Sequence, residues 1–99
     1  MSSQPPLGPA KTAIVTGAAG LLGRAISISL LEDGLNVVLV DADHSTLRTF
    51  EEQLPESKKR KVLTVNEDIS HQGSAEAIVE SAIDKFGAID ILVNNAATK

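Results

Sequence analysis

The sequence predicts a doubly wound α/β domain, in which helices cover both faces of a parallel β-sheet. Short apolar runs alternate with stretches of helical periodicity, and together they give the order βαβαβαβ. The apolar runs are nearly continuous, which is typical of strands buried on both faces. Strands separated by helices pair in parallel through right-handed crossovers, so we expect the strand order 3-2-1-4.

The first two strands and the helix between them are the plainest elements. Residues 12–16 (TAIVT) form a short β-branched run before a glycine, and residues 35–40 (LNVVLV) are apolar over their last four positions. The helix is expected over 21–33, with Gly34 after its last turn. Three- and four-residue spacing predicts its buried face to contain Leu22, Ala25, Ile26, Ser29 and Leu30.

The middle of the chain predicts a second helix and a third strand. The helix is expected over 45–54, with Asp43 or His44 near its start and Pro55 ending it. The strand is expected over 62–65, where the apolar run is shorter and weaker than in the first two strands.

The last part of the chain predicts a third helix over 72–86 and a fourth strand over 89–93. The helix is expected to begin at a cap formed by Ser70 or Ser74. Residues 94–99 follow the strand as a polar tail. The helical stripe is the clearest in the sequence and contains Ala75, Ile78, Val79, Ala82, Ile83 and Phe86.

Composition excludes several classes of protein. The formal net charge is −4, so no overall basic field draws the chain to nucleic acid or to an anionic membrane. It has no cysteine, which excludes disulfides and thiolate metal sites. No apolar run approaches the roughly 18 residues that a membrane span needs. We therefore expect a cytoplasmic protein with neither a nucleic acid nor a membrane as partner.

The chain is expected to contain one domain behind a short leader. Residues 1–10 are rich in Ser, Pro and Gly and are expected to be disordered, whereas 11–99 form the folded domain. The basic stretch 58–61 (KKRK) could be a nuclear-import or nucleic-acid patch, but the acidic net charge favours a solvated loop. His44 and His71 are isolated in sequence, so we assign neither a metal nor a catalytic role.

A glycine-rich turn, TGAAGLLG over residues 16–23, follows the first strand and opens the first helix. Glycine permits a sharp turn and a close approach of pyrophosphate, and the helix N-terminus offers unpaired N–H groups and a positive dipole end. This context indicates a Rossmann-type dinucleotide site, although Ala18 stands at the first position of the G-x-G-x-x-G spacing. The candidate phosphate-binding residues are Gly17, Ala19, Gly20, Leu21, Leu22 and Gly23.

Asp41 is the first polar residue after the second strand. A carboxylate there can accept hydrogen bonds from both hydroxyl groups of the adenosine ribose and repels a 2′-phosphate, which favours NAD over NADP. Asp43 is the alternative ribose ligand, with Asp41 then a solvated loop residue. Arg24 keeps NADP open, because an arginine near this site can pair with a 2′-phosphate.

Four features occur in order along the chain: the turn TGAAGLLG, Asp41 at the strand end, the pair Asp68-Ile69 and the run Asn94-Asn95-Ala96-Ala97. Together they resemble the short-chain dehydrogenase/reductase family, in the family's order and over about residues 11–97. The resemblance implies that Asp68 and the backbone of Ile69 hold the adenine ring. It also implies that Asn94, Asn95 and Ala96, in the run NNAA, steady the sheet and line the cofactor pocket. A full-length relative is expected to form a homo-oligomer.

The glycine spacing T-G-x-x-G-x-x-G is nearer to the family's extended branch, since Leu21 stands where the classical branch has glycine. The run Asn94-Asn95-Ala96 is instead a mark of the classical branch, which has glycine at the position of Ala97. We favour the classical branch. The alternative is the start of an extended-type epimerase or dehydratase acting on a nucleotide sugar.

Catalysis in this family uses a Tyr with a Lys four residues later, an upstream Ser and a further Asn. The sequence contains no Tyr, so no residue is assigned a catalytic role. We expect the dinucleotide-binding part of an oxidoreductase that moves hydride between NAD and an alcohol or carbonyl compound, incomplete at its C-terminus and inactive alone. The other alternative is a non-catalytic nucleotide-binding or interaction module.

The fourth strand is expected to pair with the first strand on one side only. Its other edge and the neighbouring apolar faces then lack a cover, and an exposed apolar edge favours association. We therefore expect the isolated chain to be poorly stable or to self-associate.

Overall fold

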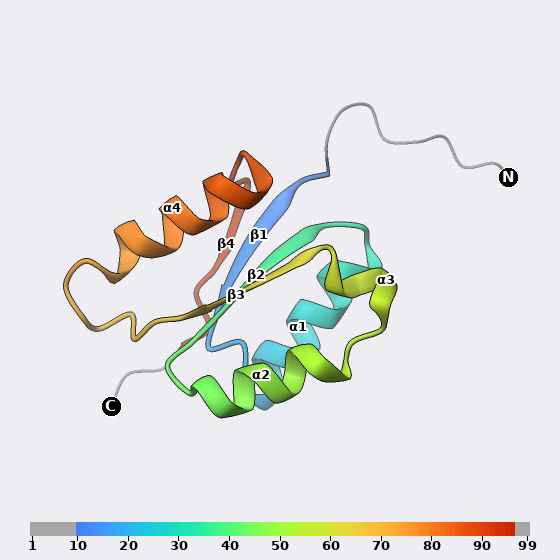
Figure 1. Ribbon diagram of the computed structural model, residues 1–99, viewed down its shortest axis with the longest axis horizontal. Helices are drawn as coiled ribbons and strands as arrows, with labels where there is room; N and C mark the ends of the chain where they lie inside the picture. Colours follow the sequence, from blue (N-terminus) through green and yellow to red (C-terminus); the bar gives the residue numbers. More distant parts are fainter. Residues whose placement is uncertain (1–9, 97–99) are drawn as a thin grey trace, which may run out of the picture.

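Four parallel strands form one sheet in the order β3-β2-β1-β4 (Figure 1). The computed structural model describes residues 10–96, so the expected leader, apart from Ala10, lies outside it. The strands are β1 (Thr12–Thr16), β2 (Asn36–Asp41), β3 (Val62–Asn66) and β4 (Ile91–Val93). This arrangement confirms the predicted fold class and strand order.

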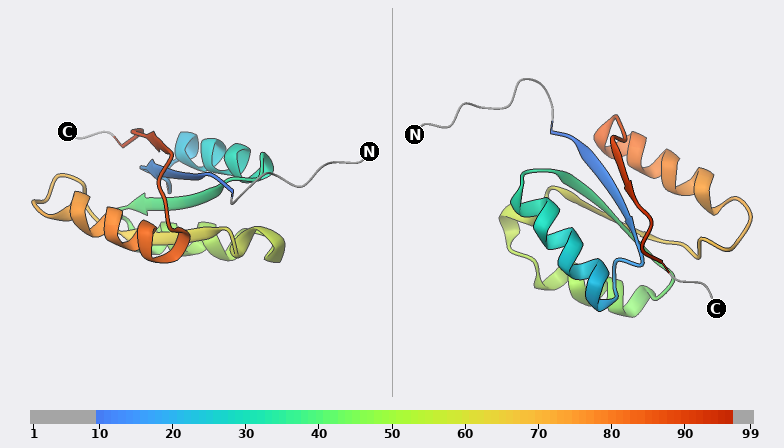
Figure 2. Two further views of the ribbon diagram at one scale, coloured as in Figure 1. Left: turned by 90° about the horizontal axis from the view of Figure 1, so that it is seen from above. Right: turned by 180° about the vertical axis from the view of Figure 1, so that it is seen from behind.

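Helices cover the two faces of the sheet, as Figures 1 and 2 show. On one face lie α1 (Leu21–Glu32) and α2 (His44–Gln53), and on the other lies α4 (Ser74–Phe86). A single turn, α3 (Glu56–Lys59), connects α2 to β3. The doubly wound architecture is therefore present in the described part of the chain.

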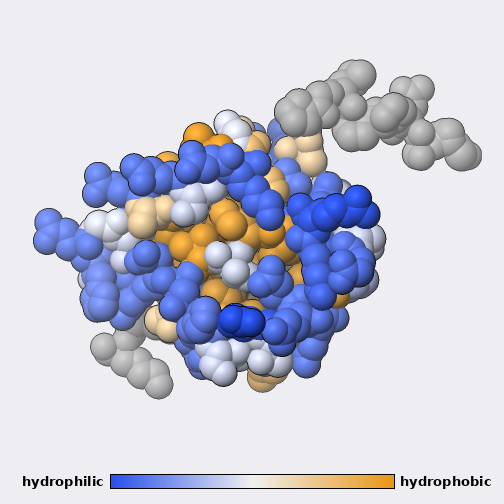
Figure 3. Space-filling view, viewed as in Figure 1, coloured by the Kyte–Doolittle hydropathy of each residue, from blue (hydrophilic) through white to orange (hydrophobic). Residues whose placement is uncertain are grey.

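The core consists of two layers because successive side chains of a strand point to opposite faces. Val15, Val37 and Leu39 pack against α1 and α2, whereas Ile14 and Val38 pack on the side of α4. Both faces of β1 and β2 are thus buried, which accounts for their nearly continuous apolar sequences. In Figure 3 the sheet layer is visible as hydrophobic residues framed by the hydrophilic outer faces of the helices.

The predicted buried face of the first helix is wrong by about one position. The buried residues of α1 are Gly23, Ser27 and Leu31, with Ile26 and Leu30 partly buried. Leu22 is 62% exposed at the start of the helix. The difference arises because Gly23 brings the helix backbone onto the loop before it, and a contact through glycine is invisible to a pattern based on large apolar side chains.

Two further differences concern the ends of elements. Residues 56–59 were expected to lie outside the helices but form α3, in which the N–H groups of Lys58 and Lys59 both donate to the carbonyl of Pro55. An acid at the start of this turn and lysines at its end complement the helix dipole. The fourth strand begins at Ile91 instead of 89, because the carboxylate of Asp90 accepts the N–H of Thr12 at 2.9 Å.

Helix α4, the third helix expected from the sequence, buries only one side of its predicted apolar stripe. Ser74, Ile78 and Ala82 are buried, whereas Val79 and Ile83 are exposed. Neither serine caps the helix: Gly73 precedes it, and the hydroxyl of Ser74 donates to the carbonyl of Asp68 at 2.7 Å. No helix within residues 10–96 is long and apolar enough to cross a membrane.

Candidate nucleotide-binding site

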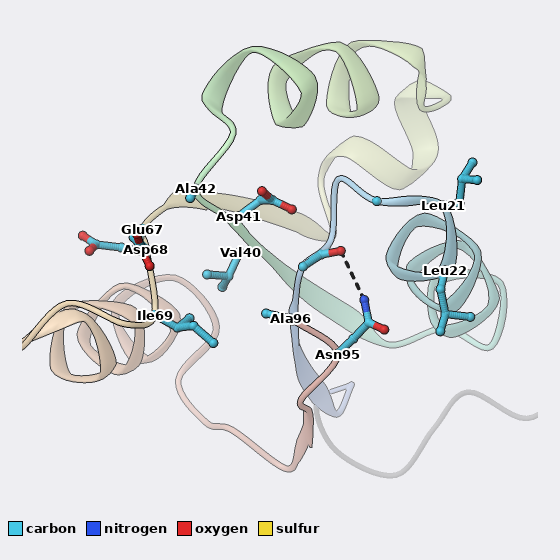
Figure 4. A pocket seen from close by; sticks show the side chains of 12 residues that line it. Leu21, Leu22, Val40, Asp41, Ala42, Glu67, Asp68, Ile69, Asn95 and Ala96 are labelled. Carbon is cyan, nitrogen blue, oxygen red and sulfur yellow. Dashed lines mark hydrogen bonds between the residues drawn. The ribbon is translucent and has the colours of Figure 1, made fainter. Parts of the chain in front are cut away.

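A cavity of about 420 Å³ lies beyond the carboxyl ends of the strands (Figure 4). In a doubly wound sheet this edge, where the strand order reverses, is the place where ligands bind. The cavity is lined by these predicted residues: Gly17, Gly20, Leu21, Leu22, Asp41, Asp68, Ile69, Asn95 and Ala96. Val40, Ala42 and Glu67 line it as well and were not predicted.

Gly17 begins the loop between β1 and α1 and has a backbone φ of +67°. A Cβ atom there would lie 3.0 Å from the α-carbon of Ala96 and 3.1 Å from Nδ2 of Asn95. The amide of Asn95 donates to the carbonyl of Gly17 at 3.3 Å, the bond drawn in Figure 4. The left-handed backbone and this close approach both require glycine.

Gly23 does not line the cavity, because it is buried where α1 meets the loop. A Cβ atom there would overlap the carbonyl oxygen of Gly17 and lie 2.8 Å from the α-carbon of Ala18. Its role in this structure is to let the helix lie against the loop.

Gly20 differs from the other two glycines of the loop. A Cβ atom on it would meet only the carbonyl oxygen of Gly17, at the ordinary contact distance of 3.6 Å. The protein's own packing therefore does not require glycine there. Gly20 lines the cavity, and an unsubstituted α-carbon leaves room for a group held against the loop. The site thus fits a pyrophosphate held close to the backbone.

Hydrogen bonding within the loop leaves a defined set of donors free. The N–H groups of Ala18, Ala19 and Gly20 donate to Val40 O, Asp41 Oδ2 and Gly17 O. The first residues of α1 lie beyond reach of an intrahelical acceptor. Within residues 10–96, the N–H groups of Leu21, Leu22 and Gly23 have no acceptor. Of these donors, those of Leu21 and Leu22 belong to residues that line the cavity, and at the positive end of the helix dipole they can bind an anion there.

The carboxylate of Asp41 lies at the end of β2, between the loop and the start of α2. Its Oδ2 accepts the N–H of Ala19 and its Oδ1 accepts the N–H of Asp43, each at 2.9 Å. A carboxylate oxygen can accept two hydrogen bonds, so each oxygen keeps one position for a hydroxyl group. Asp41 lines the cavity, as Figure 4 shows.

Asp43 has a different task at the start of α2. Its side chain accepts the N–H of Thr46 at 3.1 Å and the hydroxyl of Thr46 at 2.8 Å, which makes it the N-cap of the helix. These bonds, first that of the backbone N–H, lower the pKa of Asp43. Asp43 does not line the cavity, whereas Asp41 does.

Arg24 lies away from this cavity. It lines a second cavity of about 350 Å³ between α1, α2 and α3, together with Phe50, Leu54 and Lys58. Its Nε is buried without a hydrogen-bond partner in the described residues. In this position Arg24 does not line the cavity beside Asp41.

Asp68 and Ile69 form the side of the cavity opposite α1 (Figure 4). The Asp68 carboxylate accepts the hydroxyl of Ser70 at 2.7 Å and its N–H at 2.9 Å, and these bonds lower the pKa of Asp68. His71 Nε2 lies 3.7 Å from its other oxygen. Ile69 is half-buried and packs against the core on the side of α4. An aromatic ring in the cavity can therefore lie against the apolar side chain of Ile69, with the carboxylate of Asp68 beside it as a hydrogen-bond acceptor.

The run after β4 is tied to the end of β1 through Thr16. The buried Thr16 hydroxyl accepts the N–H groups of Asn95 at 3.0 Å and Ala96 at 3.1 Å. Asn94 does not line the candidate site; its Oδ1 lies 3.3 Å from the Thr16 hydroxyl, on the side of a smaller apolar cavity. Thr16 was not singled out from the sequence, although it precedes the first glycine of the motif.

The structure thus separates the predicted residues by position. Most line the cavity, whereas Ala19 is buried under Asp41, Gly23 is packed inside the loop, and Asn94 lies on the far side of Thr16. The unpredicted lining residues are immediate neighbours of predicted ones, such as Glu67 beside Asp68. Within residues 10–96, no three His, Asp or Glu side chains come together in a way that could hold a metal ion.

Comparison with known proteins identifies relatives over nearly the whole chain. The family model for short chain dehydrogenases matches residues 11–99. A diacetyl reductase, (S)-acetoin forming, from Staphylococcus epidermidis is 41% identical over 86 residues, which are 87% of this chain and 33% of the relative. The chain spans about a third of the length of this relative.

Solved structures share the same fold. A 3-ketoacyl-(acyl-carrier-protein) reductase from Brucella melitensis, complexed with NADH, has 35% identity and a TM-score of 0.78. The match covers 89% of this chain and 35% of that one. A menthone neomenthol reductase from Mentha piperita has 30% identity and a TM-score of 0.83, over 92% of this chain and 33% of that one.

The fold, the position of the glycine loop and these matches agree with one another. The chain corresponds to the nucleotide-binding portion of such enzymes, and it belongs to the short chain dehydrogenase family.

Proposed function

We propose that this chain binds a nicotinamide dinucleotide, with the diphosphate against the loop 17–20 and the first turn of α1. The observation that carries this proposal is Gly20, whose missing side chain leaves space in the cavity and is not required by packing. The free N–H groups of Leu21 and Leu22 then bind the diphosphate oxygens. Solved relatives in complex with NADH and NAD support the choice of ligand.

The adenosine half lies between Asp41 and Ile69 in this proposal. Asp41 accepts the two ribose hydroxyls, and the adenine ring lies against Ile69 with Asp68 beside it. A negative charge at Asp41 repels a 2′-phosphate, and Arg24 lies in another cavity. We therefore propose NAD as the preferred cofactor over NADP.

Hydride transfer between NAD and an alcohol or carbonyl compound is proposed for the full-length protein, by analogy with the relatives. When bound, the cofactor supplies the redox chemistry; the residues of this chain bind and orient its adenosine and diphosphate parts. The 99 residues contain no Tyr, so we assign no proton-transfer step to them.

Calorimetric titration of the chain with NAD and NADP tests the cofactor proposal. We expect saturable binding of NAD and at least about tenfold weaker binding of NADP, since one uncompensated charge contact of this kind exceeds about 1.4 kcal/mol. Asp41→Ala should reduce the ratio of the two affinities. Arg24→Ala is the matched control and should leave that ratio unchanged. Absence of saturable binding of both nucleotides would refute the proposal.

We further infer that the chain in isolation self-associates through β4 and the adjoining face of α4. Leu92 is 65% exposed on the α4 side of the sheet, where the exposed Val79 lines the same apolar cavity. Ile83 of α4 and Ile91 of β4 are exposed as well. β4 pairs only with β1 within the described sheet, so its other edge presents free backbone groups. Sedimentation should show oligomers that dissociate on Leu92→Lys. A wild-type chain that stays monomeric over the whole concentration range would contradict this inference.

We also propose a cytoplasmic location, in keeping with the absence of cysteine and the acidic net charge. Fractionation of cells that produce the tagged chain tests it: recovery with the soluble cytoplasmic fraction is expected, and recovery with membranes would contradict it.

A further inference from the structure

The carboxylate of Asp41 is bound to the phosphate loop as well as exposed to the cavity. Its Oδ2 accepts the N–H of Ala19 at 2.9 Å. Ala19 is only 5% exposed, so water cannot readily replace this acceptor. Within residues 10–96, Asp41 is the acceptor that this buried N–H uses.

The second oxygen of the same carboxylate fixes its orientation. Oδ1 accepts the N–H of Asp43 at 2.9 Å, in the connection between β2 and α2. The side chain therefore bridges two segments, and Oδ2 cannot turn away without leaving the buried N–H of Ala19 unpaired. A carboxylate held by two N–H groups is a rigid support for the loop.

The two hydrogen bonds of Asp41 affect the position of the N–H groups that can bind an anion. Ala19 lies between Gly17 and Gly20, and Leu21 begins α1 immediately after them. The neighbouring N–H of Ala18 is held by the backbone of Val40, so two consecutive peptide units of the loop are fixed to the end of β2. Of these two attachments, only that of Ala19 depends on a side chain, the carboxylate of Asp41.

We propose that Asp41 is a positioning residue for the phosphate loop, in addition to being the ligand of the ribose. Its carboxylate holds the Ala19 peptide unit and thereby the N–H groups of Leu21 and Leu22 where a diphosphate meets them. Ribose recognition and diphosphate recognition are then coupled through one side chain. This inference rests on the proposed nucleotide-binding function.

A pair of nucleotides separates the two roles of Asp41. ADP carries both ribose hydroxyls, whereas 2′,3′-dideoxy-ADP lacks them and has no ribose contact to lose. The dissociation constants of both nucleotides are measured by calorimetry for the wild-type chain and for Asp41→Ala. We expect Asp41→Ala to weaken the dideoxy nucleotide about tenfold, the scale of one hydrogen bond to a charged group.

Asp41→Ala also removes a negative charge, and this alone should strengthen the binding of a nucleotide anion. The effect of the charge is therefore opposite to the expected loss of affinity. Asp43→Asn removes the same charge two residues away and should change the affinity far less. If Asp41→Ala binds the dideoxy nucleotide as tightly as the wild type, or more tightly, the positioning role is overturned.

Amide hydrogen exchange tests the same bridge without a ligand. The N–H of Ala19 should exchange markedly faster in Asp41→Ala than in the wild type, while Val38 in the centre of β2 stays protected. Asp41→Asn, which keeps an oxygen acceptor, should restore much of the protection of Ala19. Equal exchange at Ala19 in all three proteins would overturn the inference. Failure of wild-type ADP binding would instead overturn the proposed function, and the exchange experiment tells the two failures apart.

Discussion

The carbonyl oxygen of Gly17 occupies the place where a Cβ atom of Gly23 would lie. The first glycine of the loop and the last are thus in contact, across a turn that includes Ala18 and Gly20. This contact brings the N-terminus of α1 against the end of β1 and directs its free N–H groups into the cavity. The loop is shaped by the packing of Gly23, whereas its surface toward the cavity is left open by Gly20.

Gly23→Ala should destabilise the fold strongly. The new methyl group would overlap backbone atoms of Gly17 and Ala18, which cannot move aside as a flexible side chain can. We expect a loss of about 2–4 kcal/mol in the free energy of unfolding, at or above the usual range for overpacking. Urea denaturation monitored by circular dichroism measures it. A loss below about 1 kcal/mol would show that the loop can shift.

Gly20→Ala is the matched substitution with the opposite expectation. Its methyl group meets no atom of the protein closer than 3.6 Å, so the free energy of unfolding should change by less than about 1 kcal/mol. The same methyl group enters the cavity and should weaken NAD binding about tenfold or more. Unchanged affinity for NAD would mean that the diphosphate does not lie against this loop.

Thr16→Val should cost about 2 kcal/mol in the free energy of unfolding. The substitution keeps the shape of the side chain but leaves the N–H groups of Asn95 and Ala96 without their acceptor. Thr12→Val is the control on the same strand. The hydroxyl of Thr12 accepts one long bond of 3.4 Å from a side chain that water can reach, so its loss should cost less than about 1 kcal/mol. Equal losses in the two variants would show that Thr16 does not hold the run after β4.

The capping carboxylate of Asp43 should make stability depend on acid pH. Its pKa in the folded chain is lowered, mainly by the backbone N–H of Thr46. The stabilisation is therefore complete above the ordinary value of 3.8 and is lost as the pH falls through the lowered value. Asp43→Asn keeps a cap but cannot titrate.

Thermal melts of both proteins from about pH 6 to pH 2 measure this effect. The difference in melting temperature between wild type and Asp43→Asn should shrink as the pH falls. A difference that stays constant across this range would show that the cap makes no charge-dependent contribution.

The sequence predicted the order of the elements because each strand is a short, largely apolar run and each of the three long helices spaces its apolar residues three or four apart. It predicted the strand order because strands separated by helices pair in parallel through right-handed crossovers in a doubly wound sheet. The buried face of α1 was predicted wrongly because the contact is made by Gly23, a residue without a side chain to reveal it. The turn α3 was missed since a single helical turn has no period.

Residues of the candidate site were predictable where the local sequence shows both the residue type and its place at the end of a strand or the start of a helix. Asp41 follows a strand directly, and the glycines stand at a strand–helix junction. The bond between Asp41 and Ala19 was not predictable, because it joins residues that are 22 positions apart and depends on the pairing of β1 with β2. The separation of Arg24 from the cavity likewise depends on which way the first turn of α1 faces.

The most direct test of the account is the map of backbone amide shifts on titration with NAD. The amide signals of the 99-residue chain are followed by nuclear magnetic resonance as NAD is added. We predict saturable shifts at Leu21, Leu22, Asp41 and Ile69. We predict none at Ile28, which lines the second cavity beside Arg24. Shifts centred on Ile28, or no saturable shift at Leu21 and Leu22, would contradict the claim that this loop binds the dinucleotide.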